Sequence, residues 1–228
     1  MPFCTQSKQE AFMEQQMPVR LYDAGDMAKV YCAKCEGCGK CCHGMTDTIH
    51  LDPYDVDMLT KGLRKTFEQL MGSTIALHNE DGLVLPHLRM EDGENGACPF
   101  LGADGRCTIH AIRPGYCRLF PLGRDYSQET HTFRYFVTDN GCDMPGKMKV
   151  RISKWLGIPD LPRYEKFVTD WHYYIKDVKK VMAESDDAAF RESLNMFLLK
   201  VFYETPYDEK EGFYYWFDKR LEKARSVL

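Results

Sequence analysis

Ten cysteines occur in this chain of 228 residues, and most of them follow a spacing that is typical of metal ligands. Five stand close together, at Cys32, Cys35, Cys38, Cys41 and Cys42. Four more follow singly, at Cys98, Cys107, Cys117 and Cys142. Two thiolates separated by two residues on a tight turn can bind one metal ion, and the N–H groups of the turn can donate hydrogen bonds to the sulfurs. The cysteines therefore predict at least one metal centre.

The composition of the chain favours metal-bound thiols over disulfides. The first residues contain no apolar run of the kind that a secretory signal has, and no stretch approaches the roughly 18 apolar residues of a membrane span. We therefore expect a cytoplasmic protein without membrane contacts, whose thiols stay reduced. Adjacent Cys41 and Cys42 agree with this, because a disulfide between neighbouring residues is strained. The net charge of −4 argues against nucleic-acid binding, which depends on basic surfaces.

Two kinds of metal centre fit the cysteine spacing. Bacterial ferredoxins have the spacing C-x2-C-x2-C-x3-C, followed by proline. This spacing occurs here at Cys32, Cys35, Cys38 and Cys42, with His43 in place of the proline. The same block could instead divide its ligands between two centres. Zinc sites usually pair two C-x2-C turns, whereas here one dense block precedes single cysteines with apolar neighbours. Because apolar surroundings tune and protect a redox cluster, we favour at least one [4Fe-4S] cluster, with zinc as the alternative.

Longer motifs accompany the cysteines. They are Cys35-Glu-Gly-Cys38-Gly-Lys-Cys41-Cys42, Ile49-His-Leu-Asp52-Pro-Tyr-Asp55, Cys98-Pro-Phe-Leu101, Asp104-Gly-Arg-Cys107-Thr-Ile-His110 and Arg113-Pro-Gly-Tyr-Cys117-Arg-Leu-Phe-Pro121. This combination, over about residues 35 to 146, resembles the YkgJ-type cysteine-cluster family, which is described as chelating zinc or iron. A related arrangement occurs in bacterial flagellin lysine methylases.

The resemblance implies a set of eight metal ligands. These are Cys35, Cys38, Cys41, Cys42, Cys98, Cys107, Cys117 and Cys142. Cys142 departs from the family pattern, since Asp-Met-Pro-Gly follows it where the family tends to have Cys-Pro-Gly, and Cys32 lies outside the pattern. Eight thiolates would fill two four-coordinate centres, or would leave some thiols spare beside one centre.

Two arginines flank one of these ligands. Arg113 and Arg118 stand on either side of Cys117 and could offset the thiolate charge or anchor the loop. They could also form a cofactor-binding or substrate-binding site for an anion beside the metal. In contrast, His43, His78 and His87 have no mutual spacing that is typical of a metal site.

The remaining sequence predicts the elements that must position these ligands. Asp52 and Pro53 begin a helix whose apolar stripe continues to Gly72, and short strands are expected over residues 83–90 and 134–138. Beyond about residue 147 the cysteines end, and aromatic-rich helices are expected over residues 153–156, 163–183, 188–203 and 212–227, with the aromatic side chains in the core. We therefore predict an α+β fold with a lead-in over residues 1–30, a loop-rich metal-organised domain over residues 31–146 and a helical region over residues 147–228.

The predicted metal centre limits the classes of function to a few, but it does not indicate a particular reaction. We expect an iron–sulfur protein in electron transfer or in a cluster-dependent modification reaction, with a redox protein or a small anionic ligand as its partner. The corresponding enzyme classes are an iron–sulfur oxidoreductase and a methyltransferase-like protein. The second rests on the methylase resemblance alone, and no glycine-rich motif for S-adenosylmethionine accompanies it. The alternative is a zinc-stabilised binding module without catalysis.

Overall fold

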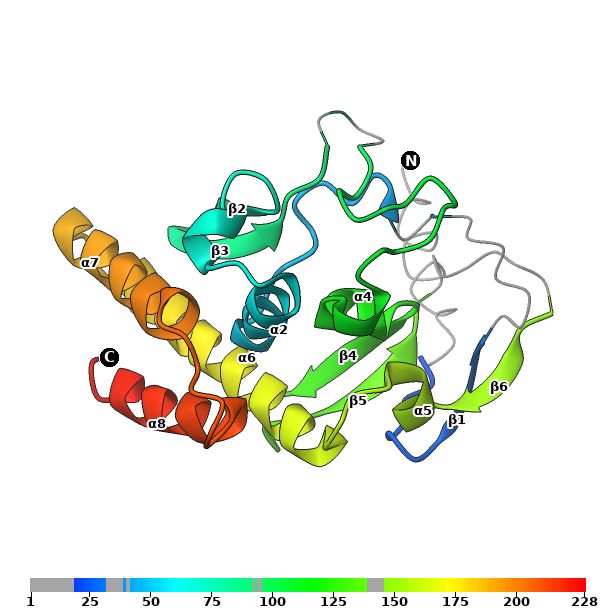
Figure 1. Cartoon of the computed structure of the whole chain (residues 1–228). Helices are drawn as coiled ribbons and strands as arrows, with labels where there is room; N and C mark the ends of the chain where they lie inside the picture. Colours follow the sequence, from blue (N-terminus) through cyan, green and yellow to red (C-terminus); the bar gives the residue numbers. More distant parts are fainter. Residues whose placement is uncertain (1–18, 32–38, 40–41, 92, 94–95, 139–145) are drawn as a thin grey trace, which may run out of the picture.

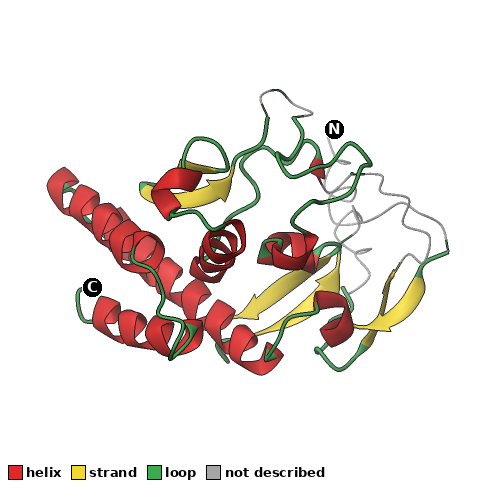
Figure 2. Cartoon of the chain, in the orientation of Figure 1, coloured by secondary structure: helices red, strands yellow, loops and turns green. Residues whose placement is uncertain are grey.

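The computed structural model describes residues 19–31, 39, 42–91, 93, 96–138 and 146–228. Its strands are β1 (Met27–Tyr31), β2 (Ile75–Glu80), β3 (Leu83–Leu88), β4 (Leu122–Ser127), β5 (Thr132–Val137) and β6 (Met148–Arg151). Its helices are α2 (Pro53–Leu63), α3 (Phe67–Leu70), α4 (Gly115–Leu119), α5 (Ile152–Leu156), α6 (Leu161–Glu184), α7 (Ala188–Leu199) and α8 (Phe213–Arg225). Helices α7 and α8 lie at one end of the molecule, and β1 and β6 lie at the other (Figures 1 and 2). The predicted α+β class is confirmed.

The strands of the described residues form three separate antiparallel pairs, β1 with β6, β2 with β3, and β4 with β5. The expected strands correspond to β3 and β5. The sequence analysis does not predict β1, β2, β4 and β6, which are short and carry few β-branched residues. Strand β1 lies within the expected lead-in, yet it buries Ala28 and Val30 at 1% exposure and pairs with a strand more than a hundred residues later.

Helix α2 begins where the sequence predicts and ends earlier. The Asp52 side chain accepts from the Asp55 N–H at 2.8 Å, and the Asp55 side chain in turn accepts from the Asp52 N–H. Pro53 stands at the first helical position. The expected continuation to Gly72 is wrong, because Arg64 adopts a left-handed conformation with φ 54°. A second capping box at Thr66 then starts α3. The apolar stripe therefore divides over two helices joined by a turn.

The carboxy-terminal helices follow the sequence prediction to within a few residues. The last turn of the helix expected over residues 188–203 becomes a π-helical turn, Lys200–Glu204. The aromatic side chains of α6 and α8 pack edge to face, as Phe167 does on Phe217 with ring centroids 4.6 Å apart, and both rings are buried. The prediction that the aromatic residues form core is confirmed for α6, whereas on α8 Tyr215 is exposed and Tyr214 and Trp216 are half-buried. Among the described residues, no helix is long and apolar enough to cross a membrane.

Helix α4 is joined to α2 through a buried carboxylate. The Gly115 N–H donates to Asp55 Oδ1 at 2.7 Å, and Asp55 is only 4% exposed. A Cβ at position 115 would collide with the hydroxyl of Tyr164 on α6. Glycine is therefore needed where α2, α4 and α6 meet.

We expect Gly115→Ala to lower the free energy of unfolding by about 1–3 kcal/mol, because the added methyl group must displace the Tyr164 hydroxyl or pull α4 away from Asp55. Urea unfolding followed by circular dichroism measures the change. Gly25→Ala is the matched control, since a Cβ at Gly25 has no atom within 4 Å. Equal stabilities of the two variants would contradict the packing described for this junction.

Candidate functional site

The structure describes four of the eight predicted metal ligands. These are Cys42, Cys98, Cys107 and Cys117. Cys98 is 9% exposed and belongs to the hydrophobic core, and the other three are half-buried and pack against that core. Cys35, Cys38, Cys41 and Cys142, together with Cys32, lie outside the described residues.

Backbone hydrogen bonds connect the segments that carry three of these cysteines. The Cys98 N–H donates to the Cys42 carbonyl at 2.7 Å, although the two residues are far apart in sequence. Cys107 forms an isolated antiparallel bridge with Leu101, whose own N–H donates to the Cys98 carbonyl at 2.9 Å. The backbone thus joins the three segments, but no three of the described cysteines bring their sulfur atoms within 4.8 Å of one another.

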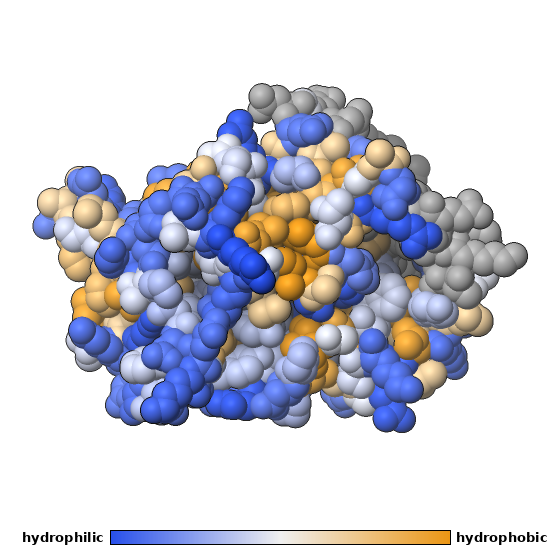
Figure 3. Space-filling model, viewed as in Figure 1, coloured by the Kyte–Doolittle hydropathy of each residue, from blue (hydrophilic) through white to orange (hydrophobic). Residues whose placement is uncertain are grey.

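Two features near these cysteines suit a thiolate-bound metal. Gly39 has φ 63°, and its carbonyl accepts from the Cys42 N–H at 2.7 Å. Ile109 is buried and Phe100 is half-buried, and each follows a described cysteine by two residues. Figure 3 shows hydrophobic side chains gathered near the middle of the face that carries α2 and α4. The donor set and its apolar surroundings fit zinc or an iron–sulfur cluster.

The two predicted arginines hold the loop that leads into α4. Arg118 is 9% exposed and donates through Nε to the Arg113 carbonyl at 3.0 Å and through Nη2 to the Ala111 carbonyl. Arg113 donates to the His110 carbonyl at 2.7 Å. These contacts fix the backbone of residues 110–113, which precedes Cys117. The hypothesis that Arg113 and Arg118 also bind an anion stays a prediction.

A cavity of about 320 Å³ lies next to α4, between α2, α6 and the β3 and β4 strands. Gly115 and Tyr116 of α4 line one side of it, directly before Cys117. Its other walls include His50, Leu51, Asp52, Asp55, Glu80, Leu85, Arg124, Tyr126, Tyr164, Val168, Trp171, His172, Ile175, Lys176, Lys179 and Tyr203. A cavity of this size, with a few charged groups among apolar and aromatic walls, is typical of a small-molecule site.

Arg124 is one of three cationic side chains in the cavity wall, together with Lys176 and Lys179. Its Nη2 donates to the Tyr164 hydroxyl at 3.3 Å, and its guanidinium lies 5.4 Å from the Phe133 ring centre. Its Nε is buried and has no hydrogen-bond partner among the described residues. A guanidinium with a donor left over is suited to a carboxylate or phosphate, which it binds in a planar two-point geometry.

Two carboxyl groups share the same wall. Burial raises the pKa of Asp52 to about 6, against the opposing effect of the Asp55 N–H and the Arg124 charge. Burial and the neighbouring Asp52 carboxylate raise the pKa of Asp55 well above its usual range. Burial also raises the pKa of Tyr164, so its phenol stays neutral. The acidic pair can therefore carry a proton near neutral pH, as catalytic acids and bases do.

The cavity and its arginine cannot be predicted from the sequence. The motifs identify Asp52 only as a helix cap and give Arg124 no role. No local signal points to Arg124, because the contact with Tyr164 spans forty residues and depends on how β4 packs on α6. The role of a half-buried arginine on a short strand can be recognised only when the position of the strand is known.

One comparison with known proteins gave a match. Residues 34–142 match the sequence model of the CxxCxxCC family, described as a "Putative zinc- or iron-chelating domain". Comparison with curated proteins and with solved structures gave no match. The resemblance of the cysteine motifs to this family is therefore confirmed over residues 34–142, and the family description supports metal binding. The similarity to flagellin lysine methylases stays a prediction.

We expect Cys107→Ser to lose bound metal and to lower the unfolding free energy together, because a structural metal contributes on the order of 10 kcal/mol to holding such loops. Metal analysis and thermal unfolding of the purified variant measure both effects. Cys4→Ser is the control, since Cys4 is not part of the cysteine motifs. A Cys107→Ser protein with the parent's metal content and melting temperature would remove Cys107 from the ligand set.

Proposed function

We propose that this chain, which carries a CxxCxxCC domain over residues 34–142, holds a [4Fe-4S] cluster and supports a modification reaction on a small anionic molecule in the cavity beside α4. The observation that carries the proposal is the position of Cys117. It follows Gly115 and Tyr116, which line the cavity, and it stands on the same short helix. The helix that carries the predicted ligand Cys117 is thus also part of the cavity wall.

Iron–sulfur ligation is favoured over zinc by the surroundings of the described cysteines. Cys98 is buried, and the other three described cysteines pack against the core. Burial and apolar neighbours are the means by which proteins set the potential of a cluster and protect it from solvent. A [4Fe-4S] cluster supplies single-electron chemistry when it is bound. The ligands would come from the predicted set of eight cysteines.

The cavity offers the groups that such a reaction needs from the protein. Arg124 can bind the anionic part of the molecule, and Tyr126 and Trp171 provide flat walls against which it can be oriented. The Asp52 and Asp55 pair can hold or release a proton at one carboxyl oxygen, because their pKa values are raised. These groups bind and position a molecule and exchange a proton with it.

Two other functions remain as alternatives. A protein that only passes electrons to a redox partner needs no charged cavity beside its cluster, so the cavity favours the modification reaction. A zinc-stabilised binding module without catalysis agrees with the family description equally well. The cavity wall would then serve binding alone.

We expect inorganic phosphate or succinate to raise the melting temperature of the anaerobically purified protein, and Arg124→Lys to abolish the increase while the metal content stays unchanged. A lysine cannot reproduce the two-point geometry of a guanidinium. Differential scanning calorimetry at several anion concentrations measures the effect.

The double variant Arg113→Lys and Arg118→Lys is the matched comparison, because it tests the other proposed anion site. An anion effect that persists in Arg124→Lys and disappears in the double variant would move the site to the Cys117 loop. An effect absent from the parent protein would contradict an anionic ligand for this cavity.

A further inference from the structure

A pair of histidines faces each other where residues 49–51 pair with strand β3. His50 and His87 form an antiparallel bridge in which the Leu51 N–H donates to the Pro86 carbonyl at 3.0 Å and the Leu88 N–H donates to the Ile49 carbonyl at 2.9 Å. This pattern makes the two histidines a non-hydrogen-bonded pair, in which opposite side chains approach most closely. Their ring centroids are 4.3 Å apart.

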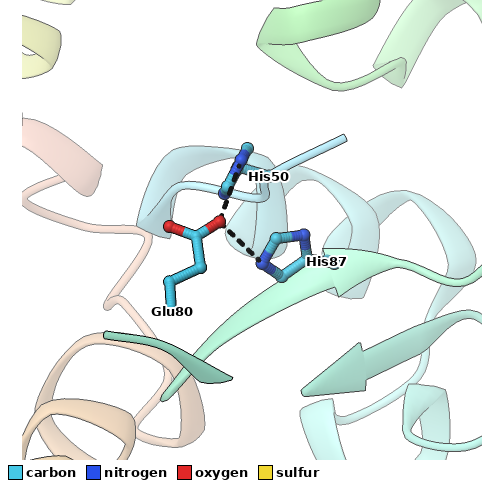
Figure 4. Close-up of side chains that lie close together, drawn as sticks. All are labelled: His50, Glu80 and His87. Carbon is cyan, nitrogen blue, oxygen red and sulfur yellow. Dashed lines mark ion pairs between the residues drawn. The ribbon is translucent and has the colours of Figure 1, made fainter. Parts of the chain in front are cut away.

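A carboxylate from strand β2 completes the group. Glu80 Oε1 lies 3.3 Å from His50 Nε2 and 3.9 Å from His87 Nε2, and the three ligand atoms all lie within 4.8 Å of one another (Figure 4). An ion bound at about 2.0–2.1 Å in tetrahedral geometry keeps its ligand atoms roughly 3.3 Å apart. The observed group is close to that spacing and needs only small side-chain rotations to reach it.

The buried histidine has a nitrogen that the protein leaves without a hydrogen bond. His87 is 1% exposed, and its Nε2 has no hydrogen-bond partner among the described residues. Its Nδ1 contacts the Asp47 carbonyl, to which only an N–H can donate. Nε2 therefore carries the lone pair, and it points toward Glu80 (Figure 4). A backbone carbonyl on the second ring nitrogen is the usual way in which a protein orients a metal-binding histidine.

Glu80 is held in a similar way. Its second oxygen, Oε2, lies 3.1 Å from the ammonium group of Lys179 on α6. The lysine fixes the carboxylate from one side and leaves Oε1 directed at the two imidazoles. His78 is nearby, with its ring centroid 5.2 Å from that of His87, but its Nε2 lies 3.1 Å from Asp47 Oδ2 instead.

We propose that His50, Glu80 and His87 bind a divalent transition-metal ion, separately from the cysteine cluster. Two imidazole nitrogens and one carboxylate oxygen form a donor set that suits Zn²⁺ and leaves a coordination position for water or a ligand. His50 and Glu80 also line the cavity beside α4, so the ion lies at the edge of that cavity. The site contains no sulfur and does not depend on which metal the cysteines hold.

The test is a calorimetric titration of zinc chloride, under argon, into the full chain after its cysteine-bound metal has been quantified. The parent protein is expected to bind one further Zn²⁺ per chain. His50→Gln, Glu80→Gln and His87→Gln are each expected to weaken this binding by at least about 100-fold. His78→Gln is the matched control and is expected to bind as the parent does, because His78 contacts Asp47 and not the group.

Two results would overturn the inference. One is a parent protein that takes up no zinc beyond its cysteine sites, in which case His87 is a buried histidine that contacts water. The other is unchanged zinc binding in both His50→Gln and His87→Gln. The His50 ring is 45% exposed, so its variant reports on the site even where His87→Gln fails to fold. Titration with Co²⁺ identifies the ligands independently, since a sulfur-free site gives visible bands without a thiolate charge-transfer band.

Discussion

The arrangement of the site depends on the hydrogen bond between the buried carboxylate of Asp55 and the Gly115 N–H. This carboxylate accepts from the Gly115 N–H at the start of α4, and on its own helix it caps back toward Asp52. Leaving a buried acceptor without its donor costs about 1–3 kcal/mol of folding free energy, so separation of α2 and α4 would destabilise the protein by about this amount. Since α4 carries Cys117 and α2 packs against the aromatic helices, this one group joins the cysteine-bearing segment to the helical part of the chain.

The same contact explains the unusual electrostatics of the cavity. Docking α4 on α2 covers Asp55, while Asp52 stays half-buried at the cavity wall. Burial raises the pKa values of both carboxyl groups. Arg124 and Tyr164 stand on the same wall and place a cation and a neutral phenol beside these acids. The packing of α4 against α2 thereby contributes to a cavity wall whose carboxyl groups have raised pKa values, as acid–base groups of catalytic sites often do. The group of His50, Glu80 and His87, for which we propose a metal ion, lies at the edge of the same cavity.

Much of the helical structure could be predicted from the sequence because its signals are local. Asp52 and Pro53 mark the start of α2, and the aromatic spacing of α6 and α8 indicates a buried face. The left-handed Arg64 that ends α2 carries no comparable signal. Strands β1 and β6 pair across more than a hundred residues, and neither has an alternating pattern long enough to be recognised alone.

Part of the candidate site can likewise be predicted from the sequence and part cannot. The cysteines are recognisable by residue type and spacing, which metal coordination restricts strongly. The cavity and the histidine pair are not recognisable, because His50 meets His87 only through the pairing of residues 49–51 with β3, and Glu80 joins them from the neighbouring strand. Sequence spacing between these residues carries no information until that register is known.

We propose above all that the cysteine cluster of this protein holds iron and sulfide. The most direct measurement is the quantification of iron, acid-labile sulfide and zinc in the protein produced with iron and purified without oxygen, together with its visible absorption spectrum. We expect about four irons and four sulfides for each [4Fe-4S] cluster, with broad visible absorption that dithionite bleaches. Zinc at the cysteines with no sulfide would contradict it and would leave a zinc-stabilised binding module as the function.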